Sequence, residues 1–190
     1  MSEFVSEGVY LRRDFLPLSD LDLVLTALDG LSSRWTPSET LRALGRGRTD
    51  QIRGSDFVNQ TALDQIRRIL APAVLKWART CGFKLAVAPH LQLFPVRMIG
   101  DRTAPAYQEP HYDTQAGQPH PPICTNVFYA RAEGVVGGRL AVTPLGRPDA
   151  TDVLVVNPSI NALASFSGDR VHWVQPLYAG ERLSIVINFY

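Results

Sequence analysis

The spacing of apolar residues changes near residue 82, and this change limits the folds that the chain can adopt. Before that point, apolar residues recur at helical spacing. The stretch "SDLDLVLTALDGL" (19–31) places four of them on one helix face, namely Leu21, Val24, Leu25 and Leu28. Ser19 has the chemistry of an N-cap and Gly30 that of a helix stop, so the sequence predicts a helix between them.

A second helical stripe occupies "NQTALDQIRRILAPAVLKWARTCG" (59–82). Its apolar face is formed by Leu63, Ile66, Leu70, Val74 and Trp77. Pro72 lies inside this stripe, which predicts that the helix is kinked or split there. A short helix is also expected from Ser38 to Leu44, between the two longer ones.

After residue 82 the pattern is one of short strands separated by Gly, Pro and Asn turns. The strands are expected at 83–97, 123–131, 138–143, 152–157, 162–167, 170–175 and 183–190. Many short strands at regular spacing favour a sandwich or jelly roll. We therefore predict a mainly β fold in one domain (1–190), with a helical support region (1–82) covering one outer face of a jelly-roll core (83–190).

Composition limits the partners and the compartment. The formal net charge is only +1, so nucleic acid is not an expected partner. No apolar run approaches the length of a membrane span, and the N-terminal residues do not have the pattern of a signal peptide. Cys81 and Cys124 form neither a disulfide framework nor a C-x-x-C pair. We expect a cytoplasmic protein without a membrane partner; its oligomeric state stays open.

The segment "EPHYDTQAG" (109–117) contains an H-x-D pair. In an extended strand, residues two apart project from the same face, so His111 and Asp113 converge on one point. Alone, such a pair is more often an exposed polar pair than a metal site. If the strand of His172 lies beside it in a jelly roll, the three side chains form a 2-His-1-carboxylate facial triad, the ligand set of non-haem Fe(II) oxygenases.

Arg182 lies ten residues beyond His172, after a turn at Ala179-Gly180. A buried arginine needs an anion, and its planar fork fits a carboxylate bidentately. The hydroxyl of Ser184 lies two residues on and therefore shares the same strand face.

Together these segments resemble the Fe(II)/2-oxoglutarate-dependent dioxygenases, specifically their prolyl-hydroxylase-like branch. The resemblance lies in "HYD" (111–113), "GGRLAV" (137–142) and "FSGDRVHWVQPLYAGERLS" (166–184), and it covers roughly residues 83–190. It implies a double-stranded β-helix with supporting helices. It also implies that Fe(II) is held by His111, Asp113 and His172, and that the C5 carboxylate of 2-oxoglutarate is held by Arg182 and Ser184. The implied reaction uses O2, hydroxylates an unactivated C–H bond and releases succinate and CO2. Related halogenases lack the carboxylate ligand, so Asp113 favours hydroxylation.

The sequence departs from the family pattern at one position. Many members carry a 2-oxoglutarate-binding tyrosine on the strand before H-x-D, and Met98 stands at the nearest equivalent position. A thioether cannot donate a hydrogen bond. Asn126, on the strand after H-x-D, is the candidate replacement.

Loops around the triad are expected to form the substrate mouth. The polar candidates there are Arg97, Arg102, Tyr107, Gln115, His120, Arg131 and Arg139. If two or more arginines face the pocket, the substrate carries a carboxylate. We expect a small molecule, such as a free amino acid or a natural-product intermediate; the alternative is a prolyl-type residue in a peptide.

Two other classes of function stay open at this point. One is a non-catalytic jelly-roll binding or sensor module, and the other is a cupin-like hydrolase or isomerase that uses zinc or manganese. The complete set of His111, Asp113, His172 and Arg182 favours the oxygenase over both.

Overall fold

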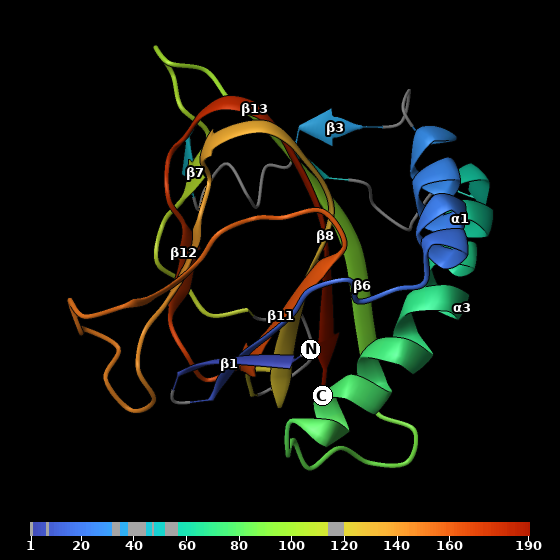
Figure 1. The fold of residues 1–190 in the computed structure, drawn as a ribbon, viewed down its shortest axis with the longest axis horizontal. Helices are drawn as coiled ribbons and strands as arrows, with labels where there is room; N and C mark the ends of the chain where they lie inside the picture. The colour runs from blue at the N-terminus through green and yellow to red at the C-terminus, as the bar shows by residue number, and fades with distance from the viewer. Residues whose placement is uncertain are drawn as a thin grey trace.

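The computed structural model describes residues 2–6, 8–31, 35–37, 45–46, 48–51, 57–113 and 120–190. Two long helices, α1 (Leu18–Asp29) and α3 (Phe57–Thr80), lie together on one side of the molecule (Figure 1). The strands are β1 (Ser2–Ser6), β2 (Val9–Arg12), β3 (Thr36–Pro37), β4 (Gly45–Arg46), β5 (Arg48–Gln51), β6 (Leu91–Ile99), β7 (Tyr107–Gln108), β8 (Cys124–Gly137), β9 (Leu140–Val142), β10 (Leu154–Val156), β11 (Ala162–Ser167), β12 (His172–Val174) and β13 (Leu177–Phe189). Neither helix is long and apolar enough to cross a membrane.

Helix α1 buries the predicted apolar face but begins two residues earlier than expected. Leu21, Val24 and Leu28 are buried in the core between the helix and the sheet. The prediction of Ser19 as the N-cap is wrong. Pro17 occupies that position, and its carbonyl accepts the first backbone hydrogen bonds, whereas Ser19 lies exposed within the first turn. The helix ends at Gly30 as predicted.

Helix α3 is one continuous helix, so Pro72 does not split it. Pro72 and Arg68, whose carbonyl loses its helical donor to the proline ring, both lie on the exposed face. Water can hydrate that carbonyl there, which explains why the chain tolerates the proline. The short helix expected from Ser38 to Leu44 lies outside the described residues.

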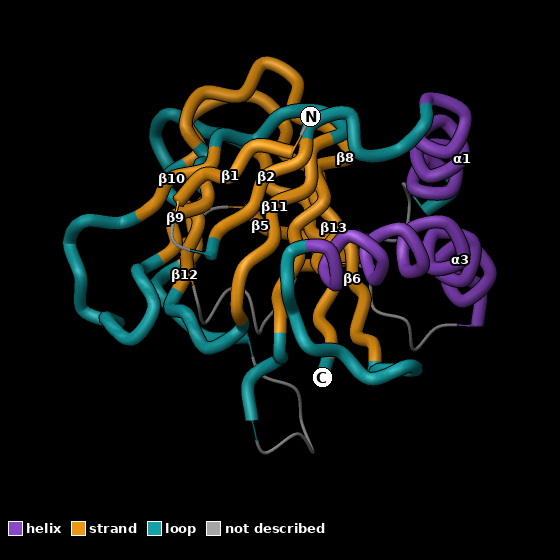
Figure 2. The backbone as a smooth tube through the Cα atoms, turned by 60° about the horizontal axis from the view of Figure 1, so that its bottom comes forward, coloured by secondary structure: helices purple, strands orange, loops and turns teal. Residues whose placement is uncertain are grey.

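The strands form an eight-stranded sheet, in the order β1-β2-β11-β8-β13-β6-β5-β3, and a three-stranded sheet, β10-β9-β12. A two-stranded pair, β4-β7, lies at the rim. Both helices pack on the outer face of the large sheet, against side chains of β8, β11 and β13 (Figures 1 and 2). The inner face of the large sheet packs against the small sheet through a second buried cluster. The prediction of a mainly β jelly roll with helices on one outer face is confirmed.

Strand β13 alternates between these two environments. Leu183, Ile185 and Ile187 face the helices, whereas Arg182 and Ser184 face the interior of the jelly roll. Residues expected as strand at 83–90 are loop and turn, while β8 and β13 are longer than predicted. The N-terminal hairpin β1–β2, which extends the large sheet, was not predicted.

Candidate active site

His111 and His172 come from neighbouring segments that pair as an isolated antiparallel bridge. The backbone N–H of each donates to the carbonyl of the other at 3.0 Å, and the ring centroids lie 4.5 Å apart. Tyr112 projects outward and is 43% exposed, so Asp113 returns to the face that His111 occupies. The alternation expected of H-x-D is therefore present, and the partner segment is the one that carries His172.

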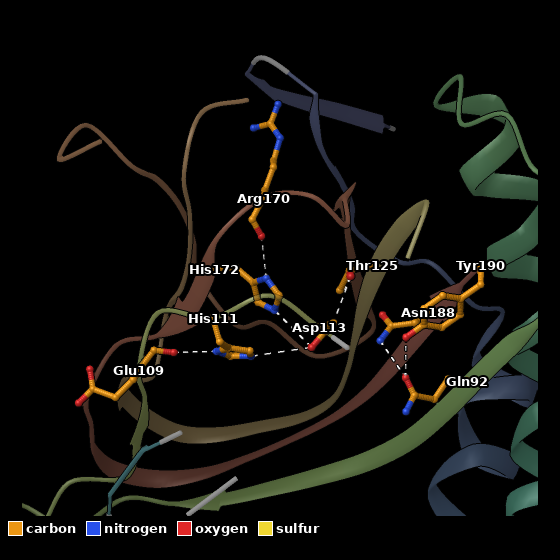
Figure 3. A network of polar contacts seen from close by, with 9 residues as sticks. All are labelled: Gln92, Glu109, His111, Asp113, Thr125, Arg170, His172, Asn188 and Tyr190. Atoms are coloured by element: carbon orange, nitrogen blue, oxygen red, sulfur yellow. Dashed lines mark hydrogen bonds and ion pairs between the residues drawn. The ribbon is translucent and has the colours of Figure 1, made fainter. Parts of the chain in front are cut away.

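The three candidate ligands point at a common centre (Figure 3). The Oδ1 atom of Asp113 lies 3.8 Å from Nε2 of His111 and 3.6 Å from Nε2 of His172. Each imidazole is oriented by its other nitrogen, since Nδ1 of His111 lies 2.7 Å from the Glu109 carbonyl and Nδ1 of His172 lies 3.2 Å from the Arg170 carbonyl. A proton on Nδ1 leaves the Nε2 lone pairs directed at the centre, as a divalent metal requires.

Electrostatics favour a carboxylate anion beside the two imidazoles. Burial alone would raise the pKa of Asp113, but the charge and hydrogen bond of His172 lower it to about 2. Burial and the neighbouring His172 lower the pKa of His111. Burial would also lower the pKa of His172, yet Asp113 outweighs it and raises that pKa. One anion with two nitrogen donors suits a divalent cation.

A second layer of polar side chains supports Asp113, and the sequence analysis did not predict it. The Thr125 hydroxyl donates to Oδ2 of Asp113 at 3.2 Å. Asn188 lies beside them on β13, and its amide donates to Oε1 of Gln92 at 3.3 Å (Figure 3). The Tyr190 hydroxyl donates to the same Gln92 oxygen at 3.2 Å. The signal that could have found this layer is alternation, because Asn188 shares its strand face with Arg182 and Ser184.

Arg182 is a buried cation with no carboxylate partner among the described residues. Its side chain is 2% exposed, its guanidinium lies 3.5 Å from the Met98 sulfur, and its Cζ lies 5.1 Å from the ring centroid of Tyr129. Within the described part of the chain, the Arg182 Nε, the Ser184 Oγ and the Tyr129 hydroxyl are buried without a hydrogen bond of ordinary geometry. Because buried donors without acceptors are costly, this set fits an anionic ligand such as the distal carboxylate of 2-oxoglutarate.

Tyr129 is a candidate co-substrate ligand that the sequence analysis missed. It is fully buried on the inner face of β8, opposite Ser184 in the β8–β13 register. Burial raises its pKa, so the phenol stays protonated and can donate to a carboxylate. Asn126 lies on the opposite face of β8, where its amide donates to the Ile187 carbonyl at 3.0 Å and accepts from Ser165 at 2.7 Å. The assignment of Asn126 as a co-substrate ligand is therefore wrong.

Two of the predicted substrate arginines point away from the interior. Arg97 forms an ion pair with Asp50 at 2.7 Å and lies over the ring of Trp35. Arg131 forms an ion pair at 2.6 Å with Asp29, at the end of α1. Because both side chains are committed to the helical side of the large sheet, their prediction as substrate residues is wrong.

The other substrate candidates have no described contact with the triad. Three are exposed, namely Arg102, His120 and Arg139. Tyr107 is half-buried on β7, and Gln115 lies outside the described residues.

Solved structures with the same architecture span nearly the whole chain. A prolyl 4-hydroxylase from Pseudomonas putida matches with a TM-score of 0.67 and 20% sequence identity, over 97% of this chain and 92% of that one. A Trichoplax adhaerens prolyl hydroxylase, solved with a hypoxia inducible factor peptide fragment, matches with a TM-score of 0.70 and 18% identity, over 97% and 84%. The chain has their fold. SnoN, an alpha-ketoglutarate-dependent epimerase of nogalamycin biosynthesis, matches with a TM-score of 0.68 and 15% identity, over 96% and 76%.

The sequence identity to these structures is low. No protein-family model matches the chain, and neither does any curated protein. The fold is therefore shared with 2-oxoglutarate oxygenases, and the case for an activity depends on the side chains described above.

Proposed function

We propose that the protein is a non-haem Fe(II)- and 2-oxoglutarate-dependent oxygenase that hydroxylates an unactivated C–H bond. The observation that carries this proposal is the pairing of two features inside one jelly roll. His111, Asp113 and His172 converge as a facial ligand set, and Arg182 is a buried cation without a described counter-ion. A zinc or manganese hydrolase would use the three metal ligands but would leave the buried Arg182 unexplained. The buried cation therefore favours an enzyme with a carboxylate co-substrate.

Each group of this chain has a role that follows from its placement. His111, Asp113 and His172 would hold Fe(II), and Arg182 with Ser184 and Tyr129 would bind the distal carboxylate of 2-oxoglutarate. Thr125 and the carbonyls of Glu109 and Arg170 fix the ligands in orientation. When bound, iron and 2-oxoglutarate activate O2, and the co-substrate leaves as succinate and CO2.

For the substrate, we propose a small molecule. The similarity to SnoN supports this class, because that enzyme belongs to a natural-product pathway. The expectation of a substrate carboxylate depended on arginines facing the pocket, and Arg97 and Arg131 face the helices instead. The proposal therefore keeps the small molecule and drops the carboxylate. Hydroxylation of a prolyl residue in a peptide is the alternative, supported by the likeness to two prolyl hydroxylases.

The test combines co-substrate turnover with a search for product. The metal-free protein is supplied with Fe(II), 2-oxoglutarate and O2, together with either a pool of small metabolites or a pool of proline-containing peptides. We expect succinate to form with the first pool, along with a product heavier by one oxygen atom. His172→Ala is the matched control and should form none. If the wild-type protein binds neither Mn(II) nor 2-oxoglutarate under anaerobic conditions, the proposal is wrong; a hydroxylated peptide would replace the small molecule by the alternative.

A further inference from the structure

Thr49, on β5, has a buried hydroxyl that the fold does not explain. The residue is 4% exposed, and its Oγ1 has no hydrogen-bond partner among the described residues. A buried hydroxyl without a partner costs free energy, and such groups in native proteins call for an explanation. Valine would fill the same space in a strand without this cost.

Strand register places Thr49 on the same sheet face as the cation of the proposed co-substrate pocket, two strands away from it. Thr49 pairs with Met98 across β5 and β6, and Met98 pairs with Arg182 across β6 and β13. Directly paired residues on neighbouring strands project from the same face of a sheet. Met98 packs in the interior cluster and contacts the guanidinium of Arg182, so Thr49 faces the same interior.

Four side chains on this face carry a buried polar atom that no described residue satisfies with a hydrogen bond of ordinary geometry. Three of these atoms are the hydroxyl oxygens of Thr49, Tyr129 and Ser184, and the fourth is Nε of Arg182, whose guanidinium otherwise contacts the Met98 sulfur and the neutral Tyr129 side chain. Met98, which lies between Thr49 and Arg182 in the register, offers only a weakly accepting thioether and no donor. A carboxylate has about four lone-pair sites and satisfies such a set.

We propose that Thr49 donates a hydrogen bond to the distal carboxylate of 2-oxoglutarate, and that β5 thereby supplies a hydroxyl donor that Met98 cannot. The inference rests on the proposed function, since it assumes that this pocket binds 2-oxoglutarate. Thr49 is a positioning residue of the co-substrate and contacts no reacting atom. The strand that carries it belongs to the helical half of the sequence, outside the segments that hold the metal ligands.

The experiment measures anaerobic binding of 2-oxoglutarate to the full chain loaded with Mn(II), by calorimetry. Thr49→Val removes the hydroxyl at nearly constant volume, and we expect the Kd to rise about 10- to 100-fold, as for the loss of one hydrogen bond to a charged group. Thr49→Ser keeps the hydroxyl and should stay within about threefold of wild type. Mn(II) affinity, measured alone, should be the same in all variants. Ser165→Ala is the matched control, because it removes a buried hydroxyl that donates to Asn126 on the opposite face of the sheet.

A second ligand locates the contact. In 2-oxopentanoate the distal carboxylate of 2-oxoglutarate is replaced by a methyl group, so Thr49→Val should leave its affinity unchanged. Equal losses for both ligands, or no loss for 2-oxoglutarate, would overturn the assignment of Thr49 while leaving the oxygenase proposal standing. If the wild-type protein binds no 2-oxoglutarate at all, both proposals fail together. Should Thr49→Val not fold, Thr49→Ala is measured against Thr49→Ser in the same way.

Discussion

Replacing Arg182 by methionine should weaken ligand binding and stabilise the ligand-free protein. The buried guanidinium gains a compensating negative charge when the anionic ligand binds and lacks one in the ligand-free protein. Its guanidinium is buried, and its described contacts are the Met98 thioether and the neutral Tyr129 side chain, through both the ring and the hydroxyl. Neither contact offers the negative charge that compensates a cation removed from water. We therefore expect Arg182→Met to abolish tight binding of 2-oxoglutarate and to raise the stability of the ligand-free protein.

The two magnitudes follow from the same geometry. A bidentate guanidinium–carboxylate contact contains two charge-assisted hydrogen bonds, each worth about 1.5–3 kcal/mol, so 2-oxoglutarate affinity should fall roughly 10²- to 10⁴-fold. Desolvating an ion costs several kcal/mol, and the cation–π contact with Tyr129 returns about 1–2 kcal/mol of this. Methionine has a similar length and leaves little cavity. We expect a net gain of about 1–2 kcal/mol, which for a chain of this size raises the Tm by roughly 2–8 °C.

The assay is thermal and urea unfolding of the metal-free protein, together with calorimetric titration of 2-oxoglutarate in the presence of Mn(II). Arg182→Lys provides the comparison, because lysine keeps the charge and loses the planar fork; its affinity should fall between those of the other two proteins. The reasoning is refuted if Arg182→Met lowers the unfolding free energy by more than about 2 kcal/mol and retains wild-type affinity, since Arg182 would then have a structural partner.

Three further predictions concern the scaffold and the metal centre. Asn161→Gly should cost about 2–4 kcal/mol in urea unfolding, because the Asn161 amide makes two buried hydrogen bonds to the backbone of Leu16; a loss below about 0.5 kcal/mol would contradict this. Thr125→Val should weaken Mn(II) binding about tenfold in calorimetry, while Thr125→Ser should not, because the lost hydroxyl orients Asp113. Mn(II) affinity should fall on acidification, because protons compete for His172. Burial lowers the pKa of His172 but Asp113 raises it more, so in a titration series the fall should begin above the ordinary value of 6.5, and a fall that begins only below that value would contradict the assignment.

Local patterns in the sequence predict the elements of this fold well. The helical stripes of α1 and α3 and the short strands after residue 82 are present because their apolar periodicity matches the surfaces that they bury. The hairpin β1–β2 was not predicted, because its local apolar pattern is weak and distant residues fix its position. It is short, the inward apolar residues of its strand β2 are Val9 and Leu11, and its place in the sheet is fixed by pairing with β11, some 150 residues away in the chain.

The convergence of the three candidate metal ligands could be predicted because each depends on a local rule. The alternation within "HYD" places His111 and Asp113 together wherever the segment is extended. His172 follows once its segment lies beside theirs, which the bridge between His111 and His172 provides. Arg182 and Ser184 follow from alternation along β13, whose pairing with β6 is regular from Glu181 to Phe189.

Alternation fails on β8, and the failure explains why Arg131 does not face the pocket. Tyr129 pairs with Ser184 and faces the interior, but the next pair across the same two strands joins Arg131 to Leu183. Ala130 is therefore an extra residue, a β-bulge, and it lies with Arg131 on the helical side. Counting in twos from Tyr129 would place Arg131 in the pocket; the bulge reverses that assignment.

Neither residue type nor spacing marks this bulge in the sequence, since Ala130 is compatible with an ordinary strand position. It is instead fixed by contacts from outside the strand. On one side of the bulge, Tyr129 packs in the interior beneath Arg182, and on the other, Arg131 reaches Asp29 on α1. Both contacts join segments more than fifty residues apart. Tertiary pairing thus decides that Arg131 lies on the helical side of β8 and does not face the pocket.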